Sequence, residues 1–250
     1  MVDEMIGALS GAAGTASERA ALETLDARQV DPPYDYPGYR STGLRSPQHA
    51  LYRVPRSAAD RHGPLFGDHL VRPGDNDLTS QHAGPPIGER ITVQGRLTDR
   101  AGRPIVHQLI ELWQANAAGR YAHVVDDHRA PLDPNFTGYG RCVTDDNGVY
   151  RFVTIKPGEY PWGNHPNAWR PAHLHFSIFG RAFVERLVTQ MYFPGDPLLV
   201  YDPMYNAVND PRAREQLVGR FELALTEPAW ALGYRFDIVV GGPSATPFED

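Results

Sequence analysis

From about residue 88 on, short stretches of alternating apolar and polar residues are separated by turn residues, and this pattern restricts the fold most. Side chains on a strand point alternately to its two faces, so each stretch can bury one face and expose the other. Such stretches cover residues 91–97, 108–113, 140–144, 149–153, 172–178, 186–192 and 234–240. Many short strands at this spacing are typical of two packed sheets, so we expect an all-β protein, an antiparallel β-sandwich.

Two local signals predict further details of the sandwich. Asn147-Gly148 lies between two strand patterns and predicts a hairpin that joins residues 140–144 to residues 149–153. Near the C-terminus, Asp210 and Pro211 are typical of the first positions of a helix. The apolar residues after them fall on one helical stripe, namely Leu217, Val218, Phe221 and Leu225. We therefore expect one helix near the C-terminus.

Residues 1–87 differ from the rest because they lack a sustained strand pattern. Thr15 to Glu18 form a capping-box pattern ahead of helically spaced apolar residues, which predicts a short N-terminal helix. Residues 31–86 are rich in proline, glycine and aspartate, so we expect an extended arm that covers a site or a partner. The predicted organisation is a helix and arm over residues 1–87 and a sandwich domain over residues 88–250, together forming one structural unit.

Composition excludes several classes of function. The formal net charge of −6 disfavours nucleic acid as a partner, because phosphate binding needs a basic surface. No apolar run approaches the roughly 20 residues that span a bilayer, so we expect no membrane insertion. The N-terminus shows no secretory signal, and the one cysteine, Cys142, has no internal disulfide partner. These features indicate a cytoplasmic protein.

Two histidines and two tyrosines form the candidate metal site. His173 and His175 are separated by one residue on a predicted strand, so both imidazoles point to the same face. Such a pair alone is more often a pair of half-buried histidines than a metal site. Tyr121 and Tyr160, however, each lie in a Gly/Pro-rich turn from which a phenol could reach the same ion. Because the pKa of tyrosine is normally about 10, a tyrosinate ligand needs a strongly Lewis-acidic cation, and ferric iron suits this role better than zinc.

The order Tyr, Tyr, His-x-His in these flanking sequences resembles the intradiol ring-cleaving dioxygenases, and among them the beta subunits of the enzymes that cleave protocatechuate. The resemblance extends from about Tyr39 to Ile238 and is far more specific than His-x-His alone. The runs that carry it are residues 88–91, 111–117, 130–136, 140–142, 154–158, 158–162, 169–176 and 234–239.

The resemblance assigns roles to individual residues. It implies that Tyr121, Tyr160, His173 and His175 bind a non-haem Fe(III) ion, and that no organic cofactor is required. Tyr160 would also act as a base that accepts a proton from the substrate.

Five further residues match the family outside the metal ligands. Arg170 would place a positive charge beside the substrate ring, and Gln190 would orient its guanidinium group. Tyr39, Trp162 and Met204 match residues of the substrate pocket, although the segment around Met204 departs from the family pattern. For the two aromatic residues, plain core packing is the competing interpretation.

The implied reaction is the cleavage of protocatechuate (3,4-dihydroxybenzoate) with O2 to 3-carboxy-cis,cis-muconate in aromatic catabolism. The implied partner is a homologous alpha subunit, which completes the pocket in an α/β hetero-oligomer. A homo-oligomeric dioxygenase for catechol or hydroxyquinol would keep the mechanism and change the pocket. Two other classes remain open: a metal-free binding module with the same sandwich fold and, more distantly, a zinc hydrolase.

Overall fold

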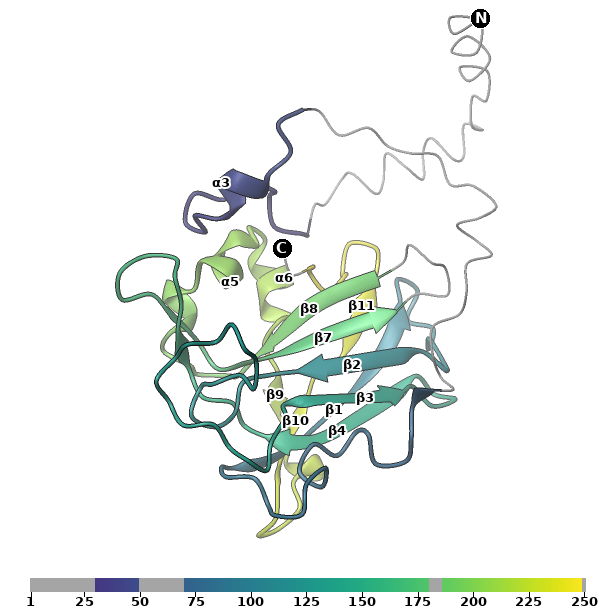
Figure 1. The fold of residues 1–250 in the computed structure, drawn as a ribbon. Coiled ribbons are helices and arrows are strands. Elements are labelled where there is room, and N and C mark those ends of the chain that lie inside the picture. The colour runs from purple at the N-terminus through teal and green to yellow at the C-terminus, as the bar shows by residue number, and fades with distance from the viewer. Residues whose placement is uncertain (1–29, 50–69, 180–185, 249–250) are drawn as a thin grey trace, which may run out of the picture.

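Two β-sheets packed face to face form the centre of the protein (Figure 1). The computed structural model describes residues 30–49, 70–179 and 186–248. One sheet has five strands and the other has four, which confirms the predicted sandwich. The predicted N-terminal helix lies outside the described residues, and the division at residues 87 and 88 stays a prediction.

The five-stranded sheet is arranged around one long strand. Its strands are β1 (Arg90–Asp99), β4 (Val149–Ile155), β9 (Arg220–Phe221), β10 (Leu232–Arg235) and β11 (Ile238–Val240). β4 runs antiparallel along one edge of β1, whereas β10 and β11 follow each other in parallel along the other edge. The sheet is therefore mixed and departs from the antiparallel pattern at these two pairings, because separate C-terminal segments return alongside β1 in the same direction.

The four-stranded sheet is antiparallel throughout and carries the predicted histidines. Its order is β3 (Tyr139–Val143), β2 (Leu109–Trp113), β7 (His173–Phe179) and β8 (Arg186–Tyr192). A separate small hairpin pairs β5 (Tyr160–Pro161) with β6 (Trp169–Arg170) just before β7. Both histidines are near the start of β7, between β2 on one side and β8 on the other.

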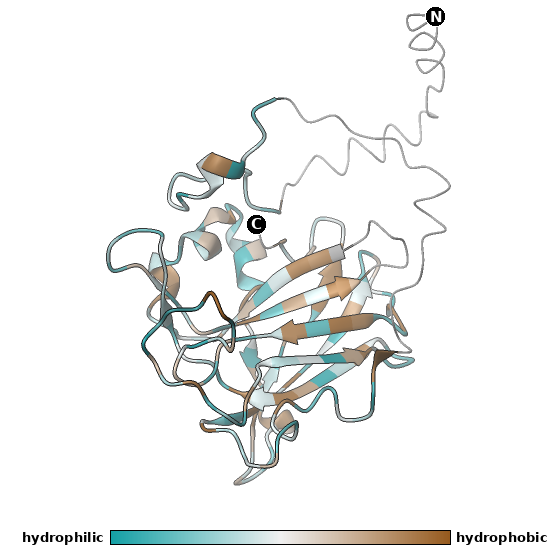
Figure 2. Ribbon diagram, in the orientation of Figure 1, coloured by the Kyte–Doolittle hydropathy of each residue, from teal (hydrophilic) through white to brown (hydrophobic). Residues whose placement is uncertain are grey.

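Apolar side chains from both sheets meet in one core. Leu112, Leu174 and Phe176 from the second sheet pack in the same cluster as Ile91 and Phe152 from the first. All five are fully buried. Figure 2 shows the hydrophobic stretches concentrated on the strands, whereas the loops are more hydrophilic. Leu174 and Phe176 thus point inward, and strand alternation directs His173 and His175 to the opposite face, as predicted.

Short helices lie beyond the β8 edge of the second sheet (Figure 1). They are α3 (Thr42–Arg45) in the arm, α5 (Pro203–Ala207) and α6 (Pro211–Glu215). A second apolar cluster packs this region together, and its buried members are Val30, Tyr192, Val208, Ala213, Leu217 and Ala245. The start of the arm is therefore part of the folded body.

The predicted hairpin between residues 140–144 and 149–153 is wrong, although its turn is correct. The amide of Gly148 donates to the carbonyl of Asp145, and Gly148 has a φ of 72°, as a tight turn requires. β3, however, pairs with β2, while β4 pairs with β1 in the other sheet. Turn residues fix the reversal of the chain but not the sheet that each strand joins.

Two predictions about the C-terminal part need correction. The expected strand over residues 234–240 is divided into β10 and β11, because Phe236 and Asp237 interrupt the pairing with β1. The side chain of Asp237 accepts from the amide of Arg96 at this interruption, at 2.9 Å. Since aspartate competes with the backbone for hydrogen bonds, it can replace a ladder partner.

The helix after Asp210 begins as predicted but ends early. Asp210 caps the helix and Pro211 is its first residue. The helix ends at Glu215, so the expected stripe is not helical: Phe221 lies in β9 and Leu225 in a 3₁₀ turn. Pairing of β9 with β10 prevails over the helical spacing. Among the helices of the described ranges, none is long and apolar enough to cross a membrane.

Candidate metal centre

Two tyrosine and histidine pairs meet at the start of β7. The phenol oxygen of Tyr121 lies 3.1 Å from Nε2 of His175, and that of Tyr160 lies 3.2 Å from Nε2 of His173. The ring centroids of the two histidines are 4.8 Å apart, and those of the two tyrosines are 5.5 Å apart. The structure thus brings the four predicted ligand residues together on one face of the sheet.

Two glycines allow the tyrosine loops to approach each other. Gly158 donates from its amide to the carbonyl of Asn116, and a side chain at Gly158 would meet the backbone of Ala117. Gly119 has a φ of 74°, and a side chain there would likewise meet the backbone of Glu159. Glycine is required where two backbones come this close. The two loops are therefore packed against each other at the glycine that lies two residues before each tyrosine.

His173 is held in one orientation by its own strand. Its Nδ1 lies 2.7 Å from the carbonyl oxygen of Pro171, so Nδ1 carries the proton and Nε2 is left as an acceptor. Burial, together with the nearby charges of Arg170 and His175, lowers the pKa of His173 well below its ordinary value. The imidazole is therefore neutral, the form that binds metal ions.

His175 is fixed by an aromatic neighbour. Trp113 is its cross-strand partner in the pairing of β2 with β7. The two rings are stacked, with centroids 4.8 Å apart and planes 5° from parallel. This contact was missed from the sequence, although the register of the two strands would reveal it.

Arg170 supplies a buried positive charge beside the four rings. It is the cross-strand partner of Tyr160 in the small hairpin, and it is 2% exposed. Its Nη2 donates to Oε1 of Gln190 at 2.5 Å, the predicted partner. The same nitrogen contacts the Tyr192 hydroxyl at 3.1 Å and Oδ2 of Asp202 at 3.2 Å, and neither residue was predicted.

The charge state of Arg170 is set by these neighbours. Burial alone would lower its pKa, but the coulombic effects of Asp202, Tyr192 and Tyr160 and the hydrogen bond to Asp202 raise it well above the ordinary value. The guanidinium group is therefore a permanent cation. A fixed charge in a water-poor site interacts more strongly with a developing anion than it would in water.

Of the three predicted pocket residues, one lies against this cation and the other two contact its neighbours. The guanidinium carbon of Arg170 lies 5.6 Å from the ring centroid of Trp162. Tyr39 meets Trp162 edge to face, with centroids 5.2 Å apart. Met204 is contacted by Nε2 of Gln190, which lies 3.6 Å from its sulfur. Tyr39 belongs to the arm, so the arm reaches the side chains next to Arg170.

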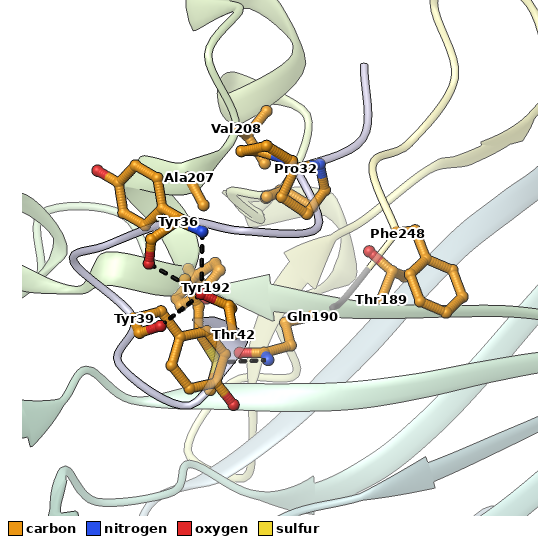
Figure 3. A pocket seen from close by; sticks show the side chains of 13 residues that line it. Pro32, Tyr36, Tyr39, Thr42, Thr189, Gln190, Tyr192, Ala207, Val208 and Phe248 are labelled. Carbon is orange, nitrogen blue, oxygen red and sulfur yellow. Dashed lines mark hydrogen bonds between the residues drawn. The ribbon is translucent and has the colours of Figure 1, made fainter. Parts of the chain in front are cut away.

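Behind Gln190, the arm and β8 enclose a cavity of about 20 Å³ (Figure 3). Tyr36, Tyr39 and Thr42 from the arm line it together with Tyr192. Thr42 ties the arm together, because its hydroxyl contacts the carbonyls of both tyrosines (Figure 3). A space of this volume accommodates about one water molecule.

The ligand set differs from that of a zinc hydrolase. Within residues 30–49, 70–179 and 186–248, no three histidine, cysteine, aspartate or glutamate side chains are grouped to hold a metal ion. Zinc sites in hydrolases are built from such residues. At the start of β7, the phenol oxygens of Tyr121 and Tyr160 lie next to the two histidines instead.

Comparison with known proteins identifies the family of this chain. A family model described as Dioxygenase matches residues 61–242, and another, described as Protocatechuate 3,4-dioxygenase beta subunit N terminal, matches residues 26–57. The chain belongs to the intradiol ring-cleavage dioxygenase family, as its motifs predicted. Within that family it is 56% identical to a protocatechuate 3,4-dioxygenase beta chain from Burkholderia cepacia, over 87% of this chain and 93% of the relative.

Two further relatives share less of their sequence with this chain. The protocatechuate 3,4-dioxygenase alpha chain from Pseudomonas putida is 29% identical, over 70% of this chain and 84% of the relative. The crystal structure of 3-chlorocatechol 1,2-dioxygenase from Rhodococcus opacus 1CP has a TM-score of 0.52 over 95% of each chain, at 21% identity. The latter likeness concerns the fold alone.

Proposed function

We propose that this chain is the iron-binding subunit of an enzyme that cleaves protocatechuate with O2 to 3-carboxy-cis,cis-muconate. The observation that carries the proposal is the convergence of Tyr121, Tyr160, His173 and His175 at the start of β7. The 56% identity to a protocatechuate 3,4-dioxygenase beta chain supports both the reaction and the substrate.

The four residues fit ferric iron by the chemistry of their donor atoms. Two phenolates and two neutral imidazoles would offset most of the charge of Fe(III), and hard phenolate oxygens favour a strongly Lewis-acidic ion. When bound, the iron would take up the deprotonated diol and make its ring reactive toward O2. His173 and His175 would bind it through Nε2, and the stacked Trp113 would keep the second ring in place.

The protein itself would handle the protons and the charge of the substrate. A catechol must lose two protons to chelate a metal. The phenolate oxygen of Tyr160, which lies beside the proposed ligand His173, would accept one of them. Arg170, next to Tyr160 across the hairpin, would stabilise the negative charge that develops on the ring. Tyr39, Trp162 and Met204 would enclose the ring and exclude water.

We further propose that a homologous alpha subunit completes the pocket in an α/β hetero-oligomer. The support is the match of residues 26–57 to the N-terminal part of protocatechuate 3,4-dioxygenase beta subunits. The alpha chains from Pseudomonas putida and Burkholderia cepacia are themselves relatives of this chain. Two homologous chains of different sequence can form one mixed assembly.

A visible absorption spectrum tests the proposal directly. The protein, co-purified with its alpha chain, is measured before and after anaerobic addition of protocatechuate. We expect a broad tyrosinate-to-iron band that shifts on addition, followed by turnover when O2 is admitted. A colourless protein that contains zinc or no metal would exclude the dioxygenase, and turnover of catechol but not of protocatechuate would exclude the substrate.

Variants of the two tyrosines separate their proposed roles. Tyr160→Phe should keep its iron but deprotonate the substrate more slowly, with kcat reduced about a hundredfold or more, as for loss of a general base. Tyr121→Phe should lose most of the colour and much of the metal. Tyr139→Phe is the control, because its hydroxyl bonds to Glu111 on β2 instead. Iron content and stopped-flow absorbance provide the measurement, and wild-type turnover in Tyr160→Phe would remove its role as a base.

A further inference from the structure

We propose that Asp202 is a positioning residue that fixes the charge of Arg170 and couples it to the pocket wall at Met204. The inference deepens the proposed function, on which it rests. The sequence did not predict the contact of Asp202 with Arg170, although Asp202 precedes Pro203 just as Asp210 precedes Pro211.

Four residues form a closed ring of contacts. Arg170 donates from Nη2 to Oε1 of Gln190, and Nε2 of Gln190 contacts the sulfur of Met204 at 3.6 Å. The amide of Met204 donates to Oδ1 of Asp202 at 3.2 Å, and Oδ2 of Asp202 accepts from Nη2 of Arg170 at 3.2 Å. A shift of the pocket wall at Met204 therefore moves two partners of Arg170.

The position of Asp202 is fixed by the backbone. It is the N-cap of α5, with Pro203 as the first residue of that helix. One carboxylate oxygen caps the helix while the other pairs with Arg170, so neither can rotate without loss of the other contact. Gln190, by contrast, accepts from the guanidinium group through a neutral amide.

Arg170 and Asp202 are buried together, so the effect of each charge on stability depends on the presence of the other. The side chains of Arg170 and Asp202 are 3% and 0% exposed. Removal of one partner from such a pair leaves the other charge buried without compensation, whereas removal of both does not. Arg170 also lies beside Tyr160, so displacement of its guanidinium group would change the field at the proposed substrate ring.

A double-mutant cycle in the holoenzyme tests the pair. The variants are Arg170→Gln, Asp202→Asn and the combination of both, and urea unfolding is measured for each. Each single variant should raise the unfolding equilibrium constant by about a hundredfold, and the combination by less than the product of the two. Additive effects would overturn the proposed coupling.

Steady-state kinetics with protocatechuate separates positioning from stability. Asp202→Asn should lower kcat at least about tenfold with little change in KM, but should cause no further loss when Arg170 is already glutamine. The matched control is Asp210→Asn, because Asp210 caps α6 in the same way, before Pro211, without being paired with Arg170. Equal losses of kcat in Asp202→Asn and Asp210→Asn would overturn the role of Asp202. So would a further loss of kcat when Asp202→Asn is added to Arg170→Gln. The unfolding cycle does not depend on turnover, so it tests the coupling even if the substrate proves different.

Discussion

The orientation and protonation of single side chains in this protein are set by their immediate neighbours. His173 shows this most clearly: its proton is placed on Nδ1 by the carbonyl of Pro171, two residues earlier in the chain. That His173 is a candidate metal ligand was predicted from the His-x-His spacing, because strand alternation is a local property. Trp113, which stacks on His175, could not be predicted, because the contact depends on how β2 and β7 are aligned.

Burial also changes the titration of Cys142, and the effect on stability can be measured. Cys142 is 8% exposed, and burial raises the pKa of its thiol to about 12 from an ordinary value of 9.0. The unfolded chain therefore releases this proton at lower pH than the folded chain. The contribution of the neutral thiol to the free energy of unfolding is complete below pH 9.0. It decreases as the pH rises from there toward the pKa of the thiol in the folded chain.

We expect the free energy of unfolding of the native protein to fall relative to that of Cys142→Ala above about pH 9, by up to about 1.4 kcal/mol per pH unit. Urea unfolding of both proteins at several pH values checks this. Other groups that titrate in this range are common to both proteins and cancel in the difference. A difference that does not change with pH would contradict the raised pKa.

At the scale of elements, close approach of strands depends on residues without side chains. Gly95 on β1 lies against the carbonyl of Phe236, at the interruption between β10 and β11, and the hydroxyl of Tyr150 contacts the same carbonyl. The interruption is stable because Asp237 replaces the missing ladder bond. Strand patterns alone predicted one continuous strand, since they do not report which backbone atoms meet.

Gly95→Ala should therefore destabilise the sandwich strongly. A methyl group at this position would overlap the backbone of Phe236, so we expect a loss of about 3 kcal/mol or more. Chemical denaturation provides the measurement. Gly43→Ala is the control, because its nearest neighbour would be a side-chain oxygen of Asp35 at 3.9 Å, and we expect a change within about 0.5 kcal/mol. Similar stabilities of the two variants would show that β1 can move away from Phe236.

At the scale of the whole molecule, contacts between distant parts of the chain hold the arm on the sandwich. The Asn164 side chain donates to the carbonyl of Gly38 at 2.9 Å and accepts from the amide of Arg40 at 2.9 Å. Tyr39, between these two residues, is thereby directed toward Trp162. At the other end, the amide of Phe248 donates to Asp31. The arm was predicted to cover a site, but its attachment points were not.

Asn164→Ala should release Tyr39 from its place beside Trp162. Loss of a hydrogen bond costs about 1 kcal/mol, so we expect KM for protocatechuate to rise about fivefold. Iron content should not change, because the hydrogen bonds of Asn164 are made to Gly38 and Arg40 in the arm. Steady-state kinetics and metal analysis check both expectations. Gln48→Ala serves as an exposed control in the same arm. An unchanged KM in Asn164→Ala would show that the hydrogen bonds of Asn164 do not position Tyr39.

The sequence alone determined most of the strand segments, the two-histidine face of β7 and the family to which the chain belongs. These features depend on alternation over a few residues and on motifs of fixed spacing, so they can be read locally. The tertiary structure alone decided which sheet β3 and β4 join and where the helix after Asp210 ends. It also paired Asp202 with Arg170, because a buried ion pair joins residues whose distance along the chain carries no signal.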